Sequence, residues 1–307
     1  MADEQVKRGR RKVLGAAVGL GGGLVGLSAR VALGSARPAV APRRIGVRRF
    51  EGKVVIVTGA TSGIGRAAAL AFAAEGAKVG FCGRREQLGR AVEQEIAAAG
   101  GEATYVRTDV LVEEEVQAFV EQVVKAYGRL NVAFNNAGIT LEKPLRLFSR
   151  DEWDLVLNTN LRGVFLALKY EIPHLIASGG GNVVVTSSTN AIASEAGRAA
   201  YAASKRALVG LVQCAALDYA QAGIRVNALL PGTTDTALVR GVAGTKNVPD
   251  AAWRVMASIW GKSHVPQGRM ATPEEIASFA LALASDEHPY LSGAALAIDG
   301  GKTAHGG

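Results

Sequence analysis

The chain has 307 residues, of which 49% are hydrophobic and 20% are charged, with 38 glycines, 9 prolines and 2 cysteines. This composition excludes a disordered, collagen-like or disulfide-rich protein. The net charge of +8 arises at the N-terminal end: residues 1–50 carry eleven Lys and Arg against two acidic side chains, whereas the other 257 residues carry 24 basic and 25 acidic ones. No nucleic-acid interface is expected, because such an interface needs a basic surface on the folded part.

Residues 1–49 form a basic leader, which we separate from one folded domain expected over residues 50–307. A Lys/Arg block at residues 7–12 precedes seventeen uncharged residues, 13–29. Two consecutive arginines near the end of this block make it resemble a twin-arginine export signal, which predicts a periplasmic protein exported through residues 1–41. Two alternatives stay open: an uncleaved membrane-associated segment, and a disordered basic leader on a cytoplasmic protein.

After the leader, short apolar runs alternate with longer amphipathic segments. The strands expected in chain order are 53–58, 78–82, 103–107, 130–134, 182–187, 224–229 and 294–298. The expected helices are 64–76, 85–99, 112–127, 151–177, 201–221 and 273–284. The strand runs are continuously apolar, as they are when helices cover both faces of a sheet. The pattern predicts an α/β fold with a single doubly wound parallel sheet of the Rossmann type.

The first expected strand leads directly into a glycine-rich loop, TGATSGIG, at residues 58–65. Glycine lets the backbone turn tightly and approach a pyrophosphate, whose charge then lies at the N-terminus of the following helix. The spacing G-x-x-x-G-x-G differs from the common dinucleotide fingerprint, and a turn needed only for packing is the structural alternative. We assign cofactor contacts to Gly59, Thr61, Ser62, Gly63, Ile64 and Gly65.

The end of the second expected strand indicates which nicotinamide cofactor binds. A carboxylate there would hold the ribose 2′-hydroxyl of NAD. The sequence instead reads Phe81-Cys82-Gly83-Arg84-Arg85, and a guanidinium can hold the 2′-phosphate of NADP with charge-assisted hydrogen bonds. We therefore expect NADP, with Arg84 and Arg85 as binding residues. NAD is the less favoured alternative, and the two arginines would then be solvated at a helix start.

A tyrosine and a lysine, Tyr201 and Lys205, are four residues apart on one face of an expected helix. Ser188 ends an expected strand thirteen residues before Tyr201. The Y-x-x-x-K pattern alone is common on helix surfaces. Together with the upstream serine and the glycine-rich loop, it becomes a specific signal for a catalytic site.

These motifs resemble those of the short-chain dehydrogenase/reductase family, over roughly residues 50–302. The resemblance also includes, in chain order, Asp109-Val110, Asn135-Asn136-Ala137-Gly138, Asn160, Pro231-Gly232 and Ile298-Asp299-Gly300-Gly301. It implies an oxidoreductase that transfers hydride between NADP(H) and a small-molecule alcohol or ketone.

The resemblance implies a role for each matched residue. Tyr201 would be the general acid and base, and Lys205 would lower the pKa of the phenol and bind the nicotinamide ribose. Ser188 would polarise the substrate oxygen. Asn160 would hold a water that links Lys205 to solvent, unless it only bonds backbone within its helix. Further cofactor contacts are expected from Asp109, Val110, Asn136, Ala137, Gly138, Tyr201, Lys205, Pro231, Gly232, Thr234 and Thr236, and Asp299 would close the last strand.

The least regular part of the domain, about residues 233–268, is expected to form a substrate lid. Trp253, Met256 and Trp260 share one helical face, and they would line either the substrate or the lid's own core. This apolar lid favours a hydrophobic or alicyclic substrate over a sugar phosphate. The two longest expected helices are apolar enough to build a homo-oligomer, a tetramer or a dimer, or simply to pack on the sheet.

Cys82 and Cys214 stand singly in apolar runs, and we expect both as buried free thiols. The cysteines and the four histidines show no metal-ligand spacing, so no metal site is expected. Three other functions remain open. One is an NAD-dependent dehydrogenase of the same family. Another is a non-enzymatic cofactor-sensing scaffold, although such scaffolds commonly lose the Tyr, Lys or Ser that this chain retains. The third is an exported, membrane-tethered interaction protein in which the enzyme domain is incidental.

Overall fold

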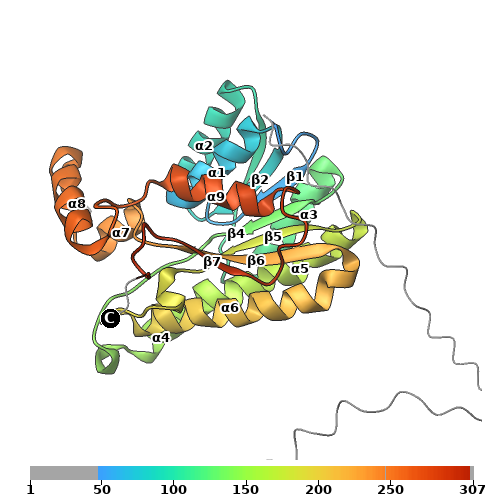
Figure 1. The fold of residues 1–307 in the computed structure, drawn as a ribbon. Coiled ribbons are helices and arrows are strands. Elements are labelled where there is room, and N and C mark those ends of the chain that lie inside the picture. The colour runs from blue at the N-terminus through green and yellow to red at the C-terminus, as the bar shows by residue number, and fades with distance from the viewer. Residues whose placement is uncertain (1–47, 246, 305–307) are drawn as a thin grey trace, which may run out of the picture. The chain divides into compact units, whose positions relative to one another are not determined.

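The computed structural model describes residues 48–245 and 247–304. At its centre lies a seven-stranded sheet with the strand order β3-β2-β1-β4-β5-β6-β7, in which every neighbouring pair is parallel (Figure 1). The strands are β1 (Val54–Val57), β2 (Lys78–Gly83), β3 (Glu102–Arg107), β4 (Val132–Asn135), β5 (Gly181–Thr186), β6 (Ile224–Pro231) and β7 (Ala295–Ile298). Each lies where the sequence predicts a strand, and the doubly wound parallel sheet is confirmed.

Helices cover both faces of this sheet (Figure 1). They are α1 (Gly63–Ala74), α2 (Glu86–Ala98), α3 (Glu113–Tyr127), α4 (Arg150–Leu157), α5 (Gly163–Ala177), α6 (Ala199–Tyr219), α7 (Ala237–Val242), α8 (Asp250–His264) and α9 (Pro273–Ala284). One core cluster joins α1, α2 and α9 to the sheet, and a second joins α3, α5 and α6 to the opposite face.

Alternate residues of one strand serve the two clusters, which explains why the strand sequences are continuously apolar. Val55 and Val57 of β1 belong to the cluster beneath α1 and α9, whereas Val54 and Ile56 belong to the cluster above α3 and α5. All four side chains are at most 1% exposed. A polar residue at any of these positions would lose hydration without gaining a partner.

The segment 151–177, predicted as one helix, is divided in the structure. A five-residue π-helical turn, Asn158–Arg162, separates α4 from α5, and the Gly163 N–H donates to the Asn158 carbonyl. Single π turns inside α-helices are frequent at functional sites. The prediction of an unbroken helix was therefore wrong, because apolar periodicity does not reveal the insertion of one residue.

Two further predictions need correction. The segment 233–268 is more regular than expected, because α7 and α8 fill most of its described residues. Cys82 is buried, and burial raises the pKa of its thiol to about 12, but Cys214 is exposed. Position 214 lies on α6 between the buried residues Val212 and Ala215, outside the stripe that faces the sheet. Being inside an apolar run does not decide which way a helical side chain points.

The basic leader was predicted over residues 1–49, and the export signal within it, residues 1–41, lies outside the described part of the chain. Within residues 48–245 and 247–304, no helix is long and apolar enough to cross a membrane.

Strand order reverses direction between β1 and β4, since β2 and β3 extend to one side of β1 and β4 to β7 to the other. In open α/β sheets, ligands bind at such a switch point, outside the carboxyl ends of the strands. The loops that follow β1, β4 and β5 meet there.

One carboxyl group is fully buried between α5 and the sheet. Glu171 Oε2 accepts a hydrogen bond from Asn135 Nδ2 at 2.7 Å, at the end of β4. Among the described residues, Glu171 Oε1 and Asn135 Oδ1 have no partner. Burial raises the pKa of Glu171 from 4.5 to about 7, against the opposing effect of the Asn135 hydrogen bond. A protonated Glu171 can donate to Asn135 Oδ1, so one proton supplies a partner for both unpaired atoms.

Replacing Glu171 with Gln should flatten the pH dependence of stability. The folded protein keeps the Glu171 proton up to about pH 7, whereas the unfolded chain loses it near pH 4.5. The wild type should therefore lose roughly 3 kcal/mol of unfolding free energy as pH rises through this window, and no more above it. A Gln amide pairs with Asn135 and has no proton to lose. Urea unfolding at stepped pH values measures the difference.

The matched control for this experiment is Glu121→Gln, an exposed change on α3 that should leave the wild-type profile intact. Burial lowers the pKa of Lys205 to about 7, so Lys205 adds a pH dependence only above that value. Lys205 is present in all three proteins, and its contribution cancels. Parallel profiles for the wild type and Glu171→Gln would contradict the assignment.

Candidate active site

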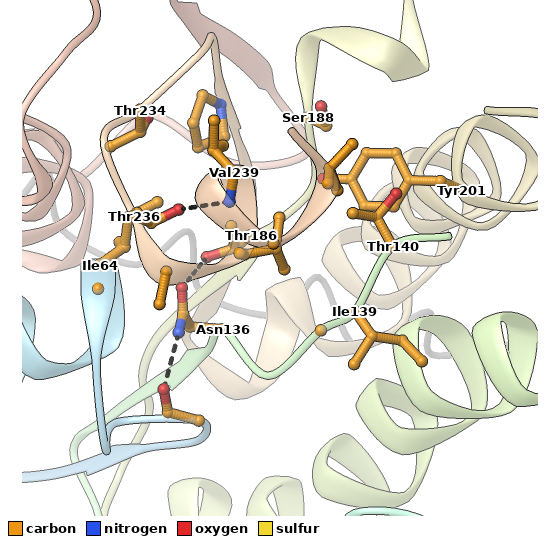
Figure 2. A pocket seen from close by; sticks show the side chains of 18 of the residues that line it. Ile64, Asn136, Ile139, Thr140, Thr186, Ser188, Tyr201, Thr234, Thr236 and Val239 are labelled. Carbon is orange, nitrogen blue, oxygen red and sulfur yellow. Dashed lines mark hydrogen bonds between the residues drawn. The ribbon is translucent and has the colours of Figure 1, made fainter. Parts of the chain in front are cut away.

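A pocket of about 1200 Å³ opens at the carboxyl ends of the strands, at the switch point (Figure 2). It brings together nearly all the site residues predicted from the sequence. Its lining includes Gly59, Thr61, Ser62, Gly63, Ile64, Arg84, Arg85, Asp109, Val110, Asn136, Ala137, Gly138, Ser188, Tyr201, Lys205, Pro231, Gly232, Thr234 and Thr236. Gly65 and Asn160, which were also predicted, do not line the pocket but support residues that do.

The glycine-rich loop approaches the β4 loop so closely that a side chain would not fit. Gly59 has φ +68°, and a Cβ built on it would lie 2.7 Å from the Cα of Ala137. A Cβ on Gly65 would lie 2.5 Å from the Gly59 carbonyl oxygen, so this glycine permits loop and helix to pack together. The result is a backbone cradle at the N-terminus of α1, which begins at Gly63. Such a cradle suits a phosphate group.

Cationic and hydroxyl side chains gather where β2 ends. Arg85 donates from Nη2 to Thr61 Oγ1 at 2.7 Å and to Ser62 Oγ at 2.6 Å. Arg84 Nη1 lies 3.6 Å from Asp109 Oδ2, and the Arg84 side chain is exposed. The guanidinium of Arg85 and the two hydroxyls form a donor set of the kind that holds a phosphate group.

A chain of hydrogen bonds joins the glycine-rich loop to Lys205. Asn136 Nδ2 donates to the Gly59 carbonyl at 3.4 Å, and Asn136 Oδ1 accepts from Thr186 Oγ1 at 3.2 Å (Figure 2). The Thr186 carbonyl in turn accepts from Lys205 Nζ at 2.7 Å. Asn136 therefore connects the ends of three strands, in addition to lining the pocket as the sequence predicts.

Ser188 and Tyr201 lie side by side at the other end of the pocket (Figure 2). Burial raises the pKa of Tyr201, and a hydrogen bond with Ser188 and the charge of Arg198 act in the opposite direction. The sequence predicts a lowered pKa for this phenol in the working site. In the protein by itself the direction is reversed, because the cost of burying a tyrosinate is larger than the effect of these neighbours.

Lys205 is 3% exposed and lies with its Nζ 5.7 Å from the centre of the Tyr201 ring. Its pKa falls to about 7, because burial disfavours the ammonium form. The carbonyl of Thr186 is its hydrogen-bond acceptor, and Nζ faces the pocket. Lys205 thus lies beside the Tyr201 ring and lines the same pocket as the backbone cradle.

The side chain of Asn160 is fully buried and fully engaged. Its Oδ1 accepts from the Ile139 N–H at 2.8 Å, and its Nδ2 donates to the Ile139 carbonyl at 2.9 Å and to Ser204 Oγ at 3.0 Å. Both amide hydrogens are therefore used within the protein. Asn160 fixes the loop after β4 against α6. The water predicted from the sequence could bind its side-chain amide only by donating to Oδ1, which has a second lone pair, because both Nδ2 hydrogens are used.

Near Tyr201 the pocket also contains charged side chains that were not predicted as site residues. Glu142, Glu195, Arg198 and Lys302 line it together with apolar residues of the lid. Arg198 lies 3.2 Å from Glu195 and 3.5 Å from Glu142, and Lys302 Nζ contacts Glu195. These residues form no local sequence motif. Glu195 and Lys302, for example, are 107 positions apart in the chain and meet only in the folded protein.

The segment predicted to form a lid contributes side chains both to its own packing and to the pocket. Trp253 is buried, and its Nε1 donates to Asp235 Oδ1 at 2.7 Å. Trp253, Met256 and Trp260 all line the pocket. Asp299 accepts from the Gly301 and Thr303 N–H groups and closes the turn after β7, as predicted.

The shape and donors of the pocket fit a nicotinamide dinucleotide. The backbone cradle would hold the pyrophosphate, Arg85 and its hydroxyl partners would lie at the adenosine end, and Lys205 would meet the nicotinamide ribose. Among the described residues there is no cluster of three or more His, Cys, Asp or Glu side chains suited to a metal ion.

Comparisons with known proteins agree with this geometry. A family model described as Enoyl-(Acyl carrier protein) reductase matches residues 59–303. A 3-oxoacyl-[acyl-carrier-protein] reductase of Thermotoga maritima is 39% identical over 255 residues, which make up 82% of this chain and 98% of that protein.

Solved structures are similar over the same part of the chain. A short-chain type dehydrogenase/reductase from Mycobacterium marinum has a TM-score of 0.76 at 32% identity and covers 84% of this chain and 98% of its own. Another similar structure is described as an NAD(P) dependent gluconate 5-dehydrogenase from Beutenbergia cavernae, with NADP bound at low occupancy. It has a TM-score of 0.76 at 36% identity, and the match covers 85% of this chain and 100% of that chain. The chain therefore belongs to the short-chain dehydrogenase/reductase family, NAD(P)-dependent oxidoreductases that act on CH–OH groups.

Proposed function

We propose that the protein is an NADP-dependent alcohol dehydrogenase or ketone reductase in which Tyr201 is the general acid and base. One observation carries this proposal. A single pocket has Tyr201, Ser188 and Lys205 at one end, and at the other a backbone cradle with the guanidinium of Arg85 beside it. A proton-transfer group and a dinucleotide cradle in one pocket are what the reaction requires.

Oxidation of an alcohol to a ketone removes a hydride from carbon and a proton from the hydroxyl. When bound, the nicotinamide cofactor supplies the hydride acceptor, or the donor in the reverse direction. Tyr201 Oη takes the hydroxyl proton, or returns it to the carbonyl oxygen. Ser188 Oγ accepts from the Asn190 N–H at 3.1 Å, which directs the serine proton away from the backbone and towards the substrate oxygen.

The proposed role sets a requirement on the Tyr201 phenol. A shift of its pKa from about 10 to about 7 needs roughly 4 kcal/mol of preferential stabilisation of the tyrosinate. Burial acts against this shift, while Arg198 and the hydrogen bond with Ser188 favour it. Lys205 Nζ lies 5.7 Å from the centre of the same ring. Hydrogen bonds to the hydroxyls of a bound ribose would favour its charged form, which would stabilise the tyrosinate further.

Tyr201→Phe should abolish turnover and leave cofactor binding largely intact. The variant keeps the ring beneath Lys205 and removes the atom that exchanges the proton. The rate of alcohol oxidation or ketone reduction should fall by at least about 100-fold. Tyr290→Phe, at a fully exposed tyrosine, makes the same chemical change outside the pocket and should behave as wild type. Substantial turnover by Tyr201→Phe would sink the assignment.

The preference for NADP is supported by the donor set at the end of β2. Arg85 already donates to Thr61 and Ser62, so a 2′-phosphate there would meet a guanidinium and two hydroxyls in one place. No carboxylate follows β2 before Glu86, and the nearby Asp109 lies within ion-pair distance of Arg84. A 2′-phosphate is thus not faced by an unpaired negative charge.

Arg85→Ala should weaken NADPH binding to the full-length protein about 10- to 100-fold, as expected for loss of charge-assisted hydrogen bonds. NADH binding should change much less. Arg84→Ala should have the smaller effect, because Arg84 is partly neutralised by Asp109. Fluorescence titration of both cofactors measures this, with Arg90→Ala, an exposed arginine of α2 paired with Glu93, as control. Tighter binding of NADH by the wild type would refute the preference.

Two further features of the enzyme belong to this proposal. We infer that it assembles as a homo-oligomer, a dimer or tetramer, through α5 and α6, which leave Phe165 50% and Leu217 79% exposed. A water relay from Lys205 to solvent would pass the π turn that carries Asn160.

Export through residues 1–41 is proposed from the two arginines and the uncharged stretch that follows them. Cell fractionation should place the full-length protein in the periplasm and a form without residues 1–41 in the cytoplasm. Replacing Arg10 and Arg11 by Lys should have the same effect as the deletion, since that pathway reads the arginine pair. A cytoplasmic location of the full-length protein would remove the export proposal and leave the enzymology unchanged.

A further inference from the structure

Two buried oxygen atoms in the pocket lack a hydrogen-bond partner among the described residues. They are Asn190 Oδ1 and Thr140 Oγ1, and both residues line the pocket that contains Ser188 and Tyr201. Thr140 lies on the same side of the pocket as these two residues (Figure 2). Buried polar atoms in folded proteins almost always have a partner, so two of them beside a reaction centre point to a ligand.

The orientation of Asn190 is fixed by its neighbours. The residue is 5% exposed, and its backbone N–H donates to Ser188 Oγ at 3.1 Å. The Asn190 side chain is near Glu195, and it acts with Lys302 and Arg198 to lower the pKa of Glu195 against the effect of burial. Among the described residues Asn190 Oδ1 has no hydrogen-bond partner. An amide oxygen accepts only, so its partner must bring a hydrogen of its own.

Thr140 follows the loop whose backbone Asn160 holds. Asn160 bonds both the N–H and the carbonyl of Ile139, which holds the backbone next to Thr140 in place. A threonine hydroxyl both donates and accepts. It can therefore complement the same group that donates to Asn190.

The charges in this half of the pocket cancel one another. Arg198 lies between Glu195 and Glu142, and Lys302 contacts Glu195. The two cations and two carboxylates that line it are thus paired within the protein. An anionic substrate would have to break these pairs, so the site favours a neutral compound. Leu141, Met256 and Trp260 supply an apolar wall for its carbon skeleton.

We propose that the substrate is a neutral diol or hydroxy ketone whose second hydroxyl, close to the reacting carbon, donates to Asn190 Oδ1 and contacts Thr140 Oγ1. This inference rests on the proposed function and names the substrate class of the same site. In the oxidative direction one C–OH group becomes C=O, its hydride passing to NADP⁺ and its hydroxyl proton to Tyr201. The second hydroxyl stays intact and serves only to orient the molecule.

The test compares substrates that differ by this one group. The full-length protein with NADP⁺ is assayed with cyclohexanol and with cis and trans forms of cyclohexane-1,2-diol and cyclohexane-1,3-diol. At least one diol should have a kcat/KM about 10- to 100-fold above that of cyclohexanol, because the mono-alcohol leaves a buried acceptor unpaired. Asn190→Leu should remove this advantage, so that the ratio of kcat/KM for that diol to kcat/KM for cyclohexanol falls to about 1.

Matched variants keep the test decisive. Thr140→Val, a nearly isosteric change, should reduce in part the ratio of kcat/KM for the diol to kcat/KM for cyclohexanol. It replaces Asn190→Leu as the test if that variant does not fold. Thr233→Val makes the same change at a pocket hydroxyl that already lies 3.4 Å from Lys302 Nζ, and it should keep the diol advantage. Folding of each variant is checked by thermal melting.

Each outcome is informative. Equal kcat/KM for diols and cyclohexanol, or a diol advantage that survives both Asn190→Leu and Thr140→Val, overturns the inference. No oxidation of any diol while NADPH still binds overturns it too, and leaves the cofactor-dependent assignment standing. Failure of the proposed function itself looks different: NADPH does not bind, or Tyr201→Phe retains the wild-type rate.

Discussion

The hydrogen bonds of Asn136 hold the active site together. This side chain lies where β1, β4 and β5 end, and it bonds the glycine-rich loop on one side and Thr186 on the other. Thr58 Oγ1 adds two more bonds, from the N–H groups of Asn136 and Ala137. The Thr186 carbonyl also accepts a hydrogen bond from Lys205 Nζ. This connected network fixes the distance between the backbone cradle and the proton-transfer residues.

This arrangement depends on the parallel sheet beneath it. Parallel strands end at a common edge, so loops that are far apart in sequence meet at the switch point. Thr58 and Thr186 are 128 positions apart, yet both bond to Asn136. The buried pair of Glu171 and Asn135 lies directly beneath, on the residue before Asn136. Both sets of hydrogen bonds therefore start from the end of β4, where the sheet holds the backbone in place.

The strands and most helices could be predicted from the sequence because their signal is local. A continuous apolar run such as Val54–Val57 fits a strand covered on both faces, and the pattern Tyr201-x-x-x-Lys205 fits one helix face. The lid helices were missed because α7 and α8 carry few buried residues, so their periodicity is weak. The burial predicted for Cys214 was wrong, because adjacent residues of a helix point in different directions and Cys214 faces the solvent.

The substrate half of the site could not be predicted, for a different reason. Lys302 reaches Glu195 across the fold, and the role of Asn190 depends on which end of its amide faces the pocket. These are properties of three-dimensional packing, with no spacing rule in the chain. By contrast, the residues of the cofactor half lie in motifs, because each strand end presents two or three consecutive residues to the same groove.

The π turn at Asn158–Arg162 determines how well this segment tolerates insertions and deletions. One additional residue per turn sets α4 and α5 out of phase by about 100°. The first half can therefore face α6 while the second packs on α3 and the sheet. Deletion of a single residue here would restore a regular helix, yet it would rotate one half against its partner and turn the Asn160 amide away from Ile139. An insertion or deletion in this turn is thus less tolerable than most point substitutions, and homologous chains should keep its length even where its residues differ.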